Sequence, residues 1–98
     1  GADFAPVADD FSNVTVYPNP VRPDYSGPVT IEGLSEGSLV KIGDASGNIF
    51  FQGRPEGGML TWNCCDRSGK RVTSGVYYVF ASSGDGSEGV VTKIMVIN

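Results

Sequence analysis

Histidine is absent from the 98-residue chain, and its absence excludes several kinds of site. A Ser-His triad, a histidine general base and a histidine-ligated metal all need an imidazole ring. No catalytic set of other residue types stands out in the sequence, so we expect no enzymatic activity and no cofactor. Long apolar runs are also lacking, because none approaches the roughly 20 residues of a membrane-spanning helix.

Basic residues are few and scattered. Seven Lys and Arg face 11 Asp and Glu, which gives a net charge of −4. Three of the acids, Asp3, Asp9 and Asp10, lie in the first twelve residues, so the remaining chain is nearly neutral. Nucleic-acid binding depends on a basic patch, and we therefore expect no nucleic-acid partner.

The first twelve residues differ from the rest in composition as well as charge. Gly1 resembles the residue left by cleavage of a purification tag, and residues 2–12 resemble a linker. We assign residues 1–12 to a tag remnant and a linker from an upstream domain. Residues 13–98 then form one domain of a larger protein.

Only two cysteines are present, and they are neighbours, Cys64 and Cys65. Adjacent cysteines rarely bond to each other, because the small ring distorts the peptide between them. They also lack the C-x-x-C spacing of a redox or zinc site. We expect two free thiols in or near a turn, with at most one of them buried.

Residues that favour β-strands are abundant in the chain. Val, Ile, Thr, Phe, Tyr and Trp together number 32, while 14 glycines and six prolines separate the apolar runs. The pattern predicts an all-β sandwich of about seven antiparallel strands in two sheets. The expected strands cover residues 14–17, 28–34, 39–44, 48–52, 59–63, 75–82 and 89–97.

The two final strands carry the strongest signals. Residues 75–82 have apolar side chains at both parities, which predicts a central strand covered on both faces. The closing strand should pair beside it through a hairpin at residues 84–87. Parity within the strands places six residues in the core: Ile42, Trp62, Val76, Tyr78, Ile94 and Val96.

Two turns share the pattern Asp-x-Ser-Gly. We expect Asp44 and Asp66 to accept hydrogen bonds from their own turns, and Gly47 and Gly69 to take positive φ. Each turn offers a single carboxylate, whereas a calcium loop needs several oxygen ligands. We therefore expect no metal in either turn, although a calcium site shared between loops remains an alternative.

Residues 84–89 match the letters G-x-G-x-x-G of dinucleotide-binding loops. That motif follows a strand and opens a helix, but here a β-rich run comes next. We therefore interpret these glycines as a hairpin turn. The aromatic residues leave a sugar-binding face open as a further alternative; they are Tyr17, Tyr25, Trp62, Tyr77 and Tyr78.

Five segments, in order, resemble the C-terminal domains of proteins handled by the type IX secretion system of Bacteroidetes. The family usually has Gly-Arg where this chain has Cys64-Cys65. The similar segments are residues 17–20 (YPNP), 40–48 (VKIGDASGN), 62–72 (WNCCDRSGKRV), 74–77 (SGVY) and 93–97 (KIMVI).

The resemblance implies an immunoglobulin-like sandwich that sorts and docks a larger exported protein. Its implied partners are translocon and attachment-complex proteins, upstream domains such as β-propellers, and anionic lipopolysaccharide. It implies passage through the periplasm to the outside of the outer membrane. The recognition signal lies in the closing strand, at Lys93, Ile94, Met95, Val96 and Ile97. The alternative function is a carbohydrate-binding module of a surface glycan-processing protein.

Overall fold

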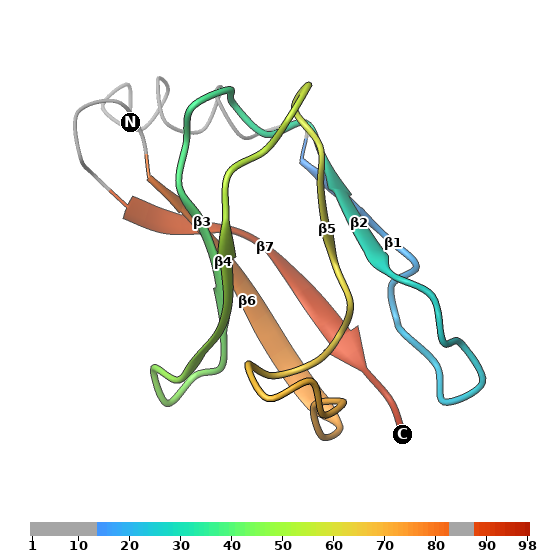
Figure 1. Ribbon diagram of the computed structural model, residues 1–98. Coiled ribbons are helices and arrows are strands. Elements are labelled where there is room, and N and C mark those ends of the chain that lie inside the picture. Colours follow the sequence, from blue (N-terminus) through green and yellow to red (C-terminus); the bar gives the residue numbers. More distant parts are fainter. Residues whose placement is uncertain (1–13, 83–87) are drawn as a thin grey trace, which may run out of the picture.

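Seven β-strands make up the part of the chain that the structure describes, residues 14–82 and 88–98 of a computed structural model (Figure 1). Among these residues no helix is long and apolar enough to cross a membrane. The all-β prediction is confirmed, with each strand ending within two residues of its expected bounds. The strands are β1 (Thr15–Tyr17), β2 (Val29–Glu32), β3 (Val40–Gly43), β4 (Ile49–Gly53), β5 (Leu60–Trp62), β6 (Gly75–Ser82) and β7 (Glu88–Val96).

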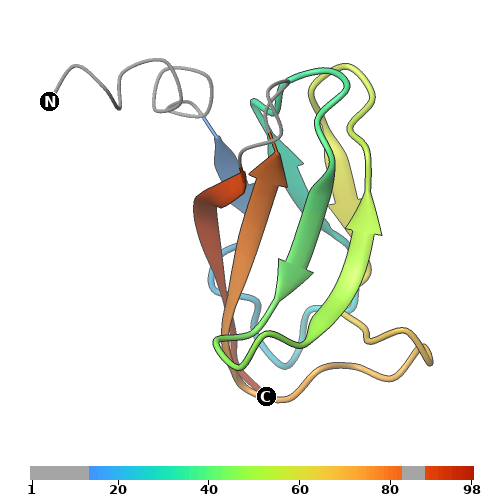
Figure 2. The ribbon, with the colours of Figure 1, turned by 90° about the vertical axis from the view of Figure 1, so that its left-hand side faces the viewer.

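The strands form two sheets that pack face to face. One sheet has the order β1-β2-β5, and the other has the order β4-β3-β6-β7. All neighbouring strands are antiparallel. Figure 2 looks onto the outer face of the four-stranded sheet, with the three-stranded sheet behind it. This is the two-sheet immunoglobulin-like sandwich that was expected.

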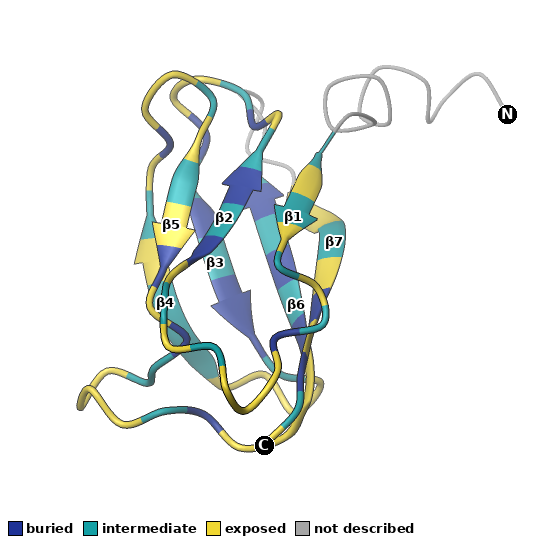
Figure 3. Ribbon diagram, turned by 90° about the vertical axis from the view of Figure 1, so that its right-hand side faces the viewer, coloured by how far each residue is buried: buried dark blue, intermediate teal, exposed yellow. Residues whose placement is uncertain are grey.

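The core lies between the two sheets (Figure 3). Trp62 is its largest fully buried side chain, and its ring centroid lies 5.8 Å from that of Tyr77. The Nε1–H group of Trp62 donates to the carbonyl of Cys65 at 3.0 Å. Four of the six predicted core residues are buried as expected: Ile42, Trp62, Ile94 and Val96.

The odd-numbered residues of β6, and not the even-numbered ones, face the core. The predictions for Val76 and Tyr78 were therefore wrong. Val76 is 38% exposed and Tyr78 is half-buried, whereas Tyr77 and Val79 are buried. Apolar residues stand at both odd and even positions of β6, so the pattern alone does not decide which set is buried. A hydrogen bond of Tyr77 accounts for the burial of the odd-numbered set. The buried hydroxyl of Tyr77 donates to the carbonyl of Thr73 at 2.6 Å, as in the tyrosine corner of immunoglobulin-like domains.

β6 lies inside its sheet, between β3 and β7, but only its inner face is covered. The closing strand pairs with it as predicted, from Gly75 opposite Val96 to Ser82 opposite Glu88. β7 is therefore an edge strand of the four-stranded sheet. Residues 1–12, assigned to a tag remnant and linker, fall outside the described residues. So do residues 84–87, which were interpreted as a hairpin and carry most of the G-x-G-x-x-G letters.

Candidate functional site

The closing segment presents alternate side chains to opposite faces of the sheet. Ile94 and Val96 are buried in the core, Lys93 and Met95 are exposed, and Ile97 is half-buried. This follows from the pleat of a strand, in which successive side chains point to opposite faces. Of the five residues in the implied recognition signal, Lys93 and Met95 are thus the ones whose side chains are open to a partner.

The YPNP segment fixes the free edge of β7. The side-chain amide of Asn19 donates to the carbonyl of Lys93 at 3.0 Å and accepts from the N–H of Met95 at 2.9 Å. Two residues later, the N–H of Val21 donates to the carbonyl of Met95 at 2.7 Å. The carbonyl of Val21 accepts from the N–H of Ile97 at 2.8 Å. Three backbone groups on the outer edge of β7, and the N–H of Ile97 just after it, are thereby satisfied.

The position of Asn19 between two prolines explains why a side chain, and not the backbone, pairs with β7 here. Proline has no N–H group, so Pro18 and Pro20 cannot donate to a neighbouring strand. The Asn19 amide carries a donor and an acceptor with the spacing of a peptide group, and it pairs with β7 in their place. Sequence reasoning missed this role, although an asparagine between two prolines was a visible signal.

Arg71 joins residues 22 and 25, which follow the YPNP segment, to the last residue of the chain. Its guanidinium donates to the carbonyl of Tyr25 at 2.8 Å and to that of Arg22 at 3.2 Å. Its Nε–H group donates to the side-chain oxygen of Asn98 at 2.9 Å. Asn98 in turn donates from its side chain to the carbonyl of Val72 at 2.9 Å. Segments that resemble the secretion family are therefore brought together around the closing strand.

A hollow on the outer face of the four-stranded sheet includes part of this closing segment. Its volume is about 330 Å³, and we call it the outer hollow. Val76 and Met95 are 38% and 48% exposed there, so apolar surface is open to solvent. Lys93 is the charged residue of the set. The lining residues are Asn19, Val76, Tyr78, Lys93 and Met95.

The turn between β3 and β4 is organised by Asp44. Its side-chain Oδ1 accepts from the N–H groups of Ser46 and Asn48, both at 3.0 Å. Its carbonyl accepts from the N–H of Gly47 at 3.1 Å. The hydrogen bond from the Asn48 side chain to the carboxylate lowers the pKa of Asp44. Asp44 thus has the turn-capping contacts expected of it.

The second Asp-x-Ser-Gly turn, between β5 and β6, has the same design. Oδ1 of Asp66 accepts from the N–H of Ser68 at 2.9 Å, from its hydroxyl at 2.6 Å and from the N–H of Lys70 at 3.0 Å. The hydrogen bond from the Ser68 hydroxyl is the main cause that lowers the pKa of Asp66. Within residues 14–82 and 88–98, no three acidic, cysteine or histidine side chains gather closely enough to hold a metal ion.

Replacing Gly47 or Gly69 with alanine should destabilise the domain by about 1–2 kcal/mol each. Their φ angles are 92° and 90°, and a Cβ at either site would meet nothing within 4 Å. The cost therefore comes from the backbone conformation alone. Gly89→Ala is the matched control, because its site is equally open and lacks a positive φ. Thermal melts that show no loss for either turn variant would contradict the expectation.

The two cysteines are free, as expected, and they occupy different environments. Cys64 is 1% exposed, and burial raises the pKa of its thiol. Cys65 is half-exposed. Cys64 also has a φ of 63°, in the left-handed region that glycine enters freely. The family that the chain resembles usually has glycine at this position, and a left-handed backbone there is one that glycine adopts readily.

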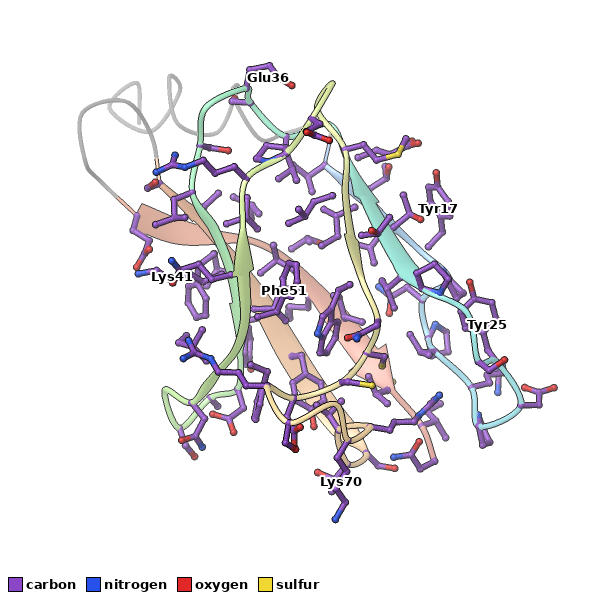
Figure 4. The ribbon with its side chains drawn as sticks, in the orientation of Figure 1. Tyr17, Tyr25, Glu36, Lys41, Phe51 and Lys70 are labelled. Carbon is purple, nitrogen blue, oxygen red and sulfur yellow. The ribbon has the colours of Figure 1, made fainter. Side chains whose placement is uncertain are left out.

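The aromatic residues do not form one surface. Trp62 and Tyr77 are in the core. Figure 4 shows Tyr17 and Tyr25 on the side of the molecule formed by β1, β2 and the loop between them. The hydroxyl of Tyr17 donates to Glu32 at 2.6 Å, which raises the pKa of Tyr17. Tyr78 lies on the outer face of the other sheet, so the shared sugar-binding face considered from sequence is not assembled.

No protein-family model matches the chain, and no curated protein matches it. Among solved structures, the chain is similar to PorZ. The superposition has a TM-score of 0.82 at 37% sequence identity and covers 93% of this chain. PorZ is an essential bacterial surface component of the type-IX secretion system of Porphyromonas gingivalis.

The chain spans 12% of the length of PorZ, so the similarity concerns one portion of that protein. The relationship with PorZ extends over nearly all of this chain, which agrees with the resemblance found in its motifs. Residues 17–25, with the sequence YPNPVRPDY, lead us to expect that the matched portion is the C-terminal domain of PorZ, and this assignment belongs to the proposal below. In this chain the same residues contact β7 through Asn19 and Val21, and Arg71 through Arg22 and Tyr25.

Proposed function

We propose that this chain is a non-catalytic C-terminal domain of a larger exported bacterial protein. It serves as a sorting and docking signal for type IX secretion and tethers the protein at the cell surface, on the outside of the outer membrane. The similarity to PorZ supports this proposal, because 37% identity extends over 93% of the chain. PorZ itself is a surface component of the same secretion system.

The observation that carries the proposal is the way the closing strand is held. Ile94 and Val96 anchor the segment in the core, while Lys93 and Met95 face outward. The contacts of Asn19 and Val21 fix the strand from its free edge. A docking signal needs side chains in a fixed arrangement, since a rigid surface loses less entropy when a partner binds.

The proposed partners are translocon and attachment-complex proteins, upstream domains of the same chain and anionic lipopolysaccharide. These belong to the proposal because the chain matches only 12% of the PorZ sequence. Activities of the longer protein would reside in its other domains. A carbohydrate-binding module remains the alternative, and a glycan array on the isolated domain tests it directly, since only that module should bind particular sugars.

Lys93→Ala should separate docking from folding. The side chain is exposed, so the free energy of unfolding should change by no more than about 0.5 kcal/mol. In the full-length protein the same change should reduce the amount that reaches the cell surface. The measurements are a thermal melt of the variant domain and cell fractionation of the parent protein. Lys70→Ala is the matched control, because Lys70 is an exposed lysine in the turn after β5.

Two results would count against the proposal. Normal surface delivery of a stably folded Lys93→Ala protein would remove this lysine from the signal. Normal export after deletion of residues 90–97 would overturn the sorting role altogether, because that deletion removes every residue assigned to it.

A further inference from the structure

We propose that the outer hollow binds an extended peptide segment that presents a large apolar side chain next to a carboxylate. The hollow combines residues from three parts of the chain: Asn19, Val76 with Tyr78, and Lys93 with Met95. As an account of how the closing strand is recognised, this rests on the proposed docking function. The peptide binding itself is measured independently of that function.

Recognition uses the side-chain face of β7 because the nearby edge is already occupied. A partner strand that extended the sheet at Lys93–Ile97 would need free N–H and C=O groups on the outer edge. Asn19 bonds the carbonyl of Lys93 and the N–H of Met95, and Val21 bonds the carbonyl of Met95. A partner at this end of β7 therefore meets side chains rather than unpaired backbone.

The apolar part of the hollow defines one half of the ligand. Val76 and Met95 lie opposite each other on β6 and β7, and both leave more than a third of their surface exposed. Tyr78 is beside them, opposite Lys93. Burying these side chains under a single large apolar group would remove hydrophobic surface from water, which favours binding. The hollow has a volume of about 330 Å³ and is open to solvent, so it suits one large side chain rather than an enclosed ligand.

Lys93 defines the other half of the ligand. It is the charged residue among those that line the hollow. Within residues 14–82 and 88–98 one ion pair is found, and it joins Lys41 to Glu88 at 3.4 Å. Lys93 forms no ion pair within these described residues, and a carboxylate from outside would complement its charge. An exposed pair of this kind adds little affinity, but it selects acidic ligands over basic ones.

The same contacts disfavour a sugar as the ligand. Sugars are held by several polar groups that converge on their hydroxyls. The side-chain amide of Asn19 already donates one hydrogen bond to β7 and accepts one from it. Val76 and Met95 offer no strong hydrogen-bonding group. The Tyr78 hydroxyl and the Lys93 ammonium are the polar groups that remain in the lining, fewer than the several hydroxyls of a sugar need. A peptide with one apolar and one acidic side chain matches this set.

The test is a titration of the 98-residue chain followed by amide NMR shifts. The probe is acetyl-Gly-Asp-Phe-Gly-amide, and the matched probe has Asn in place of Asp. We expect saturable shifts at Val76, Tyr78, Lys93 and Met95, with affinity for the Asn probe lower by about two- to fivefold. Lys93→Ala should abolish that difference between the probes. Met95→Ala should weaken binding of both by roughly five- to tenfold, whereas Met59→Ala, at an exposed methionine on the other side of the sandwich, should not.

Three results would overturn the proposal: no shift in the hollow at millimolar probe, equal affinity for the two probes, or shifts confined to the amides of residues 88–92. The last result would indicate strand addition at the other end of β7. The export assay separates this proposal from the docking function. A flat titration together with an export defect in Lys93→Ala would reject the peptide chemistry alone. Clear binding together with normal export after deletion of residues 90–97 would reject the docking function alone.

Discussion

Trp62→Ala is expected to lower the free energy of unfolding by about 3–5 kcal/mol. Trp62 is fully buried between the two sheets and packs against Tyr77. Its removal leaves a large cavity and also leaves the carbonyl of Cys65 without its donor. A domain of this size is stable by roughly 5–15 kcal/mol, so the variant should lose a large share of its stability.

Urea unfolding followed by circular dichroism measures this loss. Trp62→Phe is the matched variant, because it keeps an aromatic ring in the core and removes the hydrogen bond to Cys65. We expect its loss of stability to fall well below that of the alanine variant. An unchanged unfolding midpoint for Trp62→Ala would show that Trp62 does not support the core.

Arg71→Ala is expected to destabilise the domain by about 2 kcal/mol, the next largest effect. Hydrogen bonds from a charged group contribute about 1.5–3 kcal/mol each when they are protected, and those of Arg71 are partly exposed. The loss should appear locally as well as globally. Arg22, Tyr25 and Asn98 would each lose a hydrogen bond from the same donor side chain.

Hydrogen exchange beside thermal melts tests this prediction. Amides of residues 21–25 and 96–98 should exchange faster in Arg71→Ala than in the wild type, while amides in β3 should change less. Arg67→Ala is the control, because Arg67 is exposed in the adjacent turn. Equal melting temperatures and equal exchange in the two arginine variants would show that Arg71 does not hold residues 22 and 25 to the end of the chain.

Local patterns predicted most of the fold. Short apolar runs bounded by turn residues identified the strands, and the Asp-x-Ser-Gly pattern located the two turns, because both signals depend on residues close together in the chain. The core prediction failed only in β6, where Val76, Tyr77, Tyr78 and Val79 are all large and apolar. The deciding contact there is the hydroxyl of Tyr77 on the carbonyl of Thr73, and hydrophobic periodicity carries no information about it.

The candidate site was predicted only in part. The family resemblance assigned Lys93 and Met95 to the recognition signal, but it gave no such role to Asn19, Val76 or Tyr78, which also line the outer hollow. Asn19 and Met95 are 76 residues apart, and nothing in either segment alone indicates that they meet. Val76 and Tyr78 were assigned to the core, so their exposure on the outer face was unexpected. Such contacts follow from how the strands pair, which single-sequence patterns do not determine.

The unequal burial of the neighbouring cysteines gives the folded chain its own chemical reporter. Because Cys65 is half-exposed and Cys64 is 1% exposed with a raised thiol pKa, an alkylating reagent should modify Cys65 in the native state and reach Cys64 only after opening. The rate at which the doubly labelled protein appears would then measure how often the structure opens near Trp62. A quenched time course read by mass spectrometry measures this rate, and equal labelling rates for the two thiols would exclude this use.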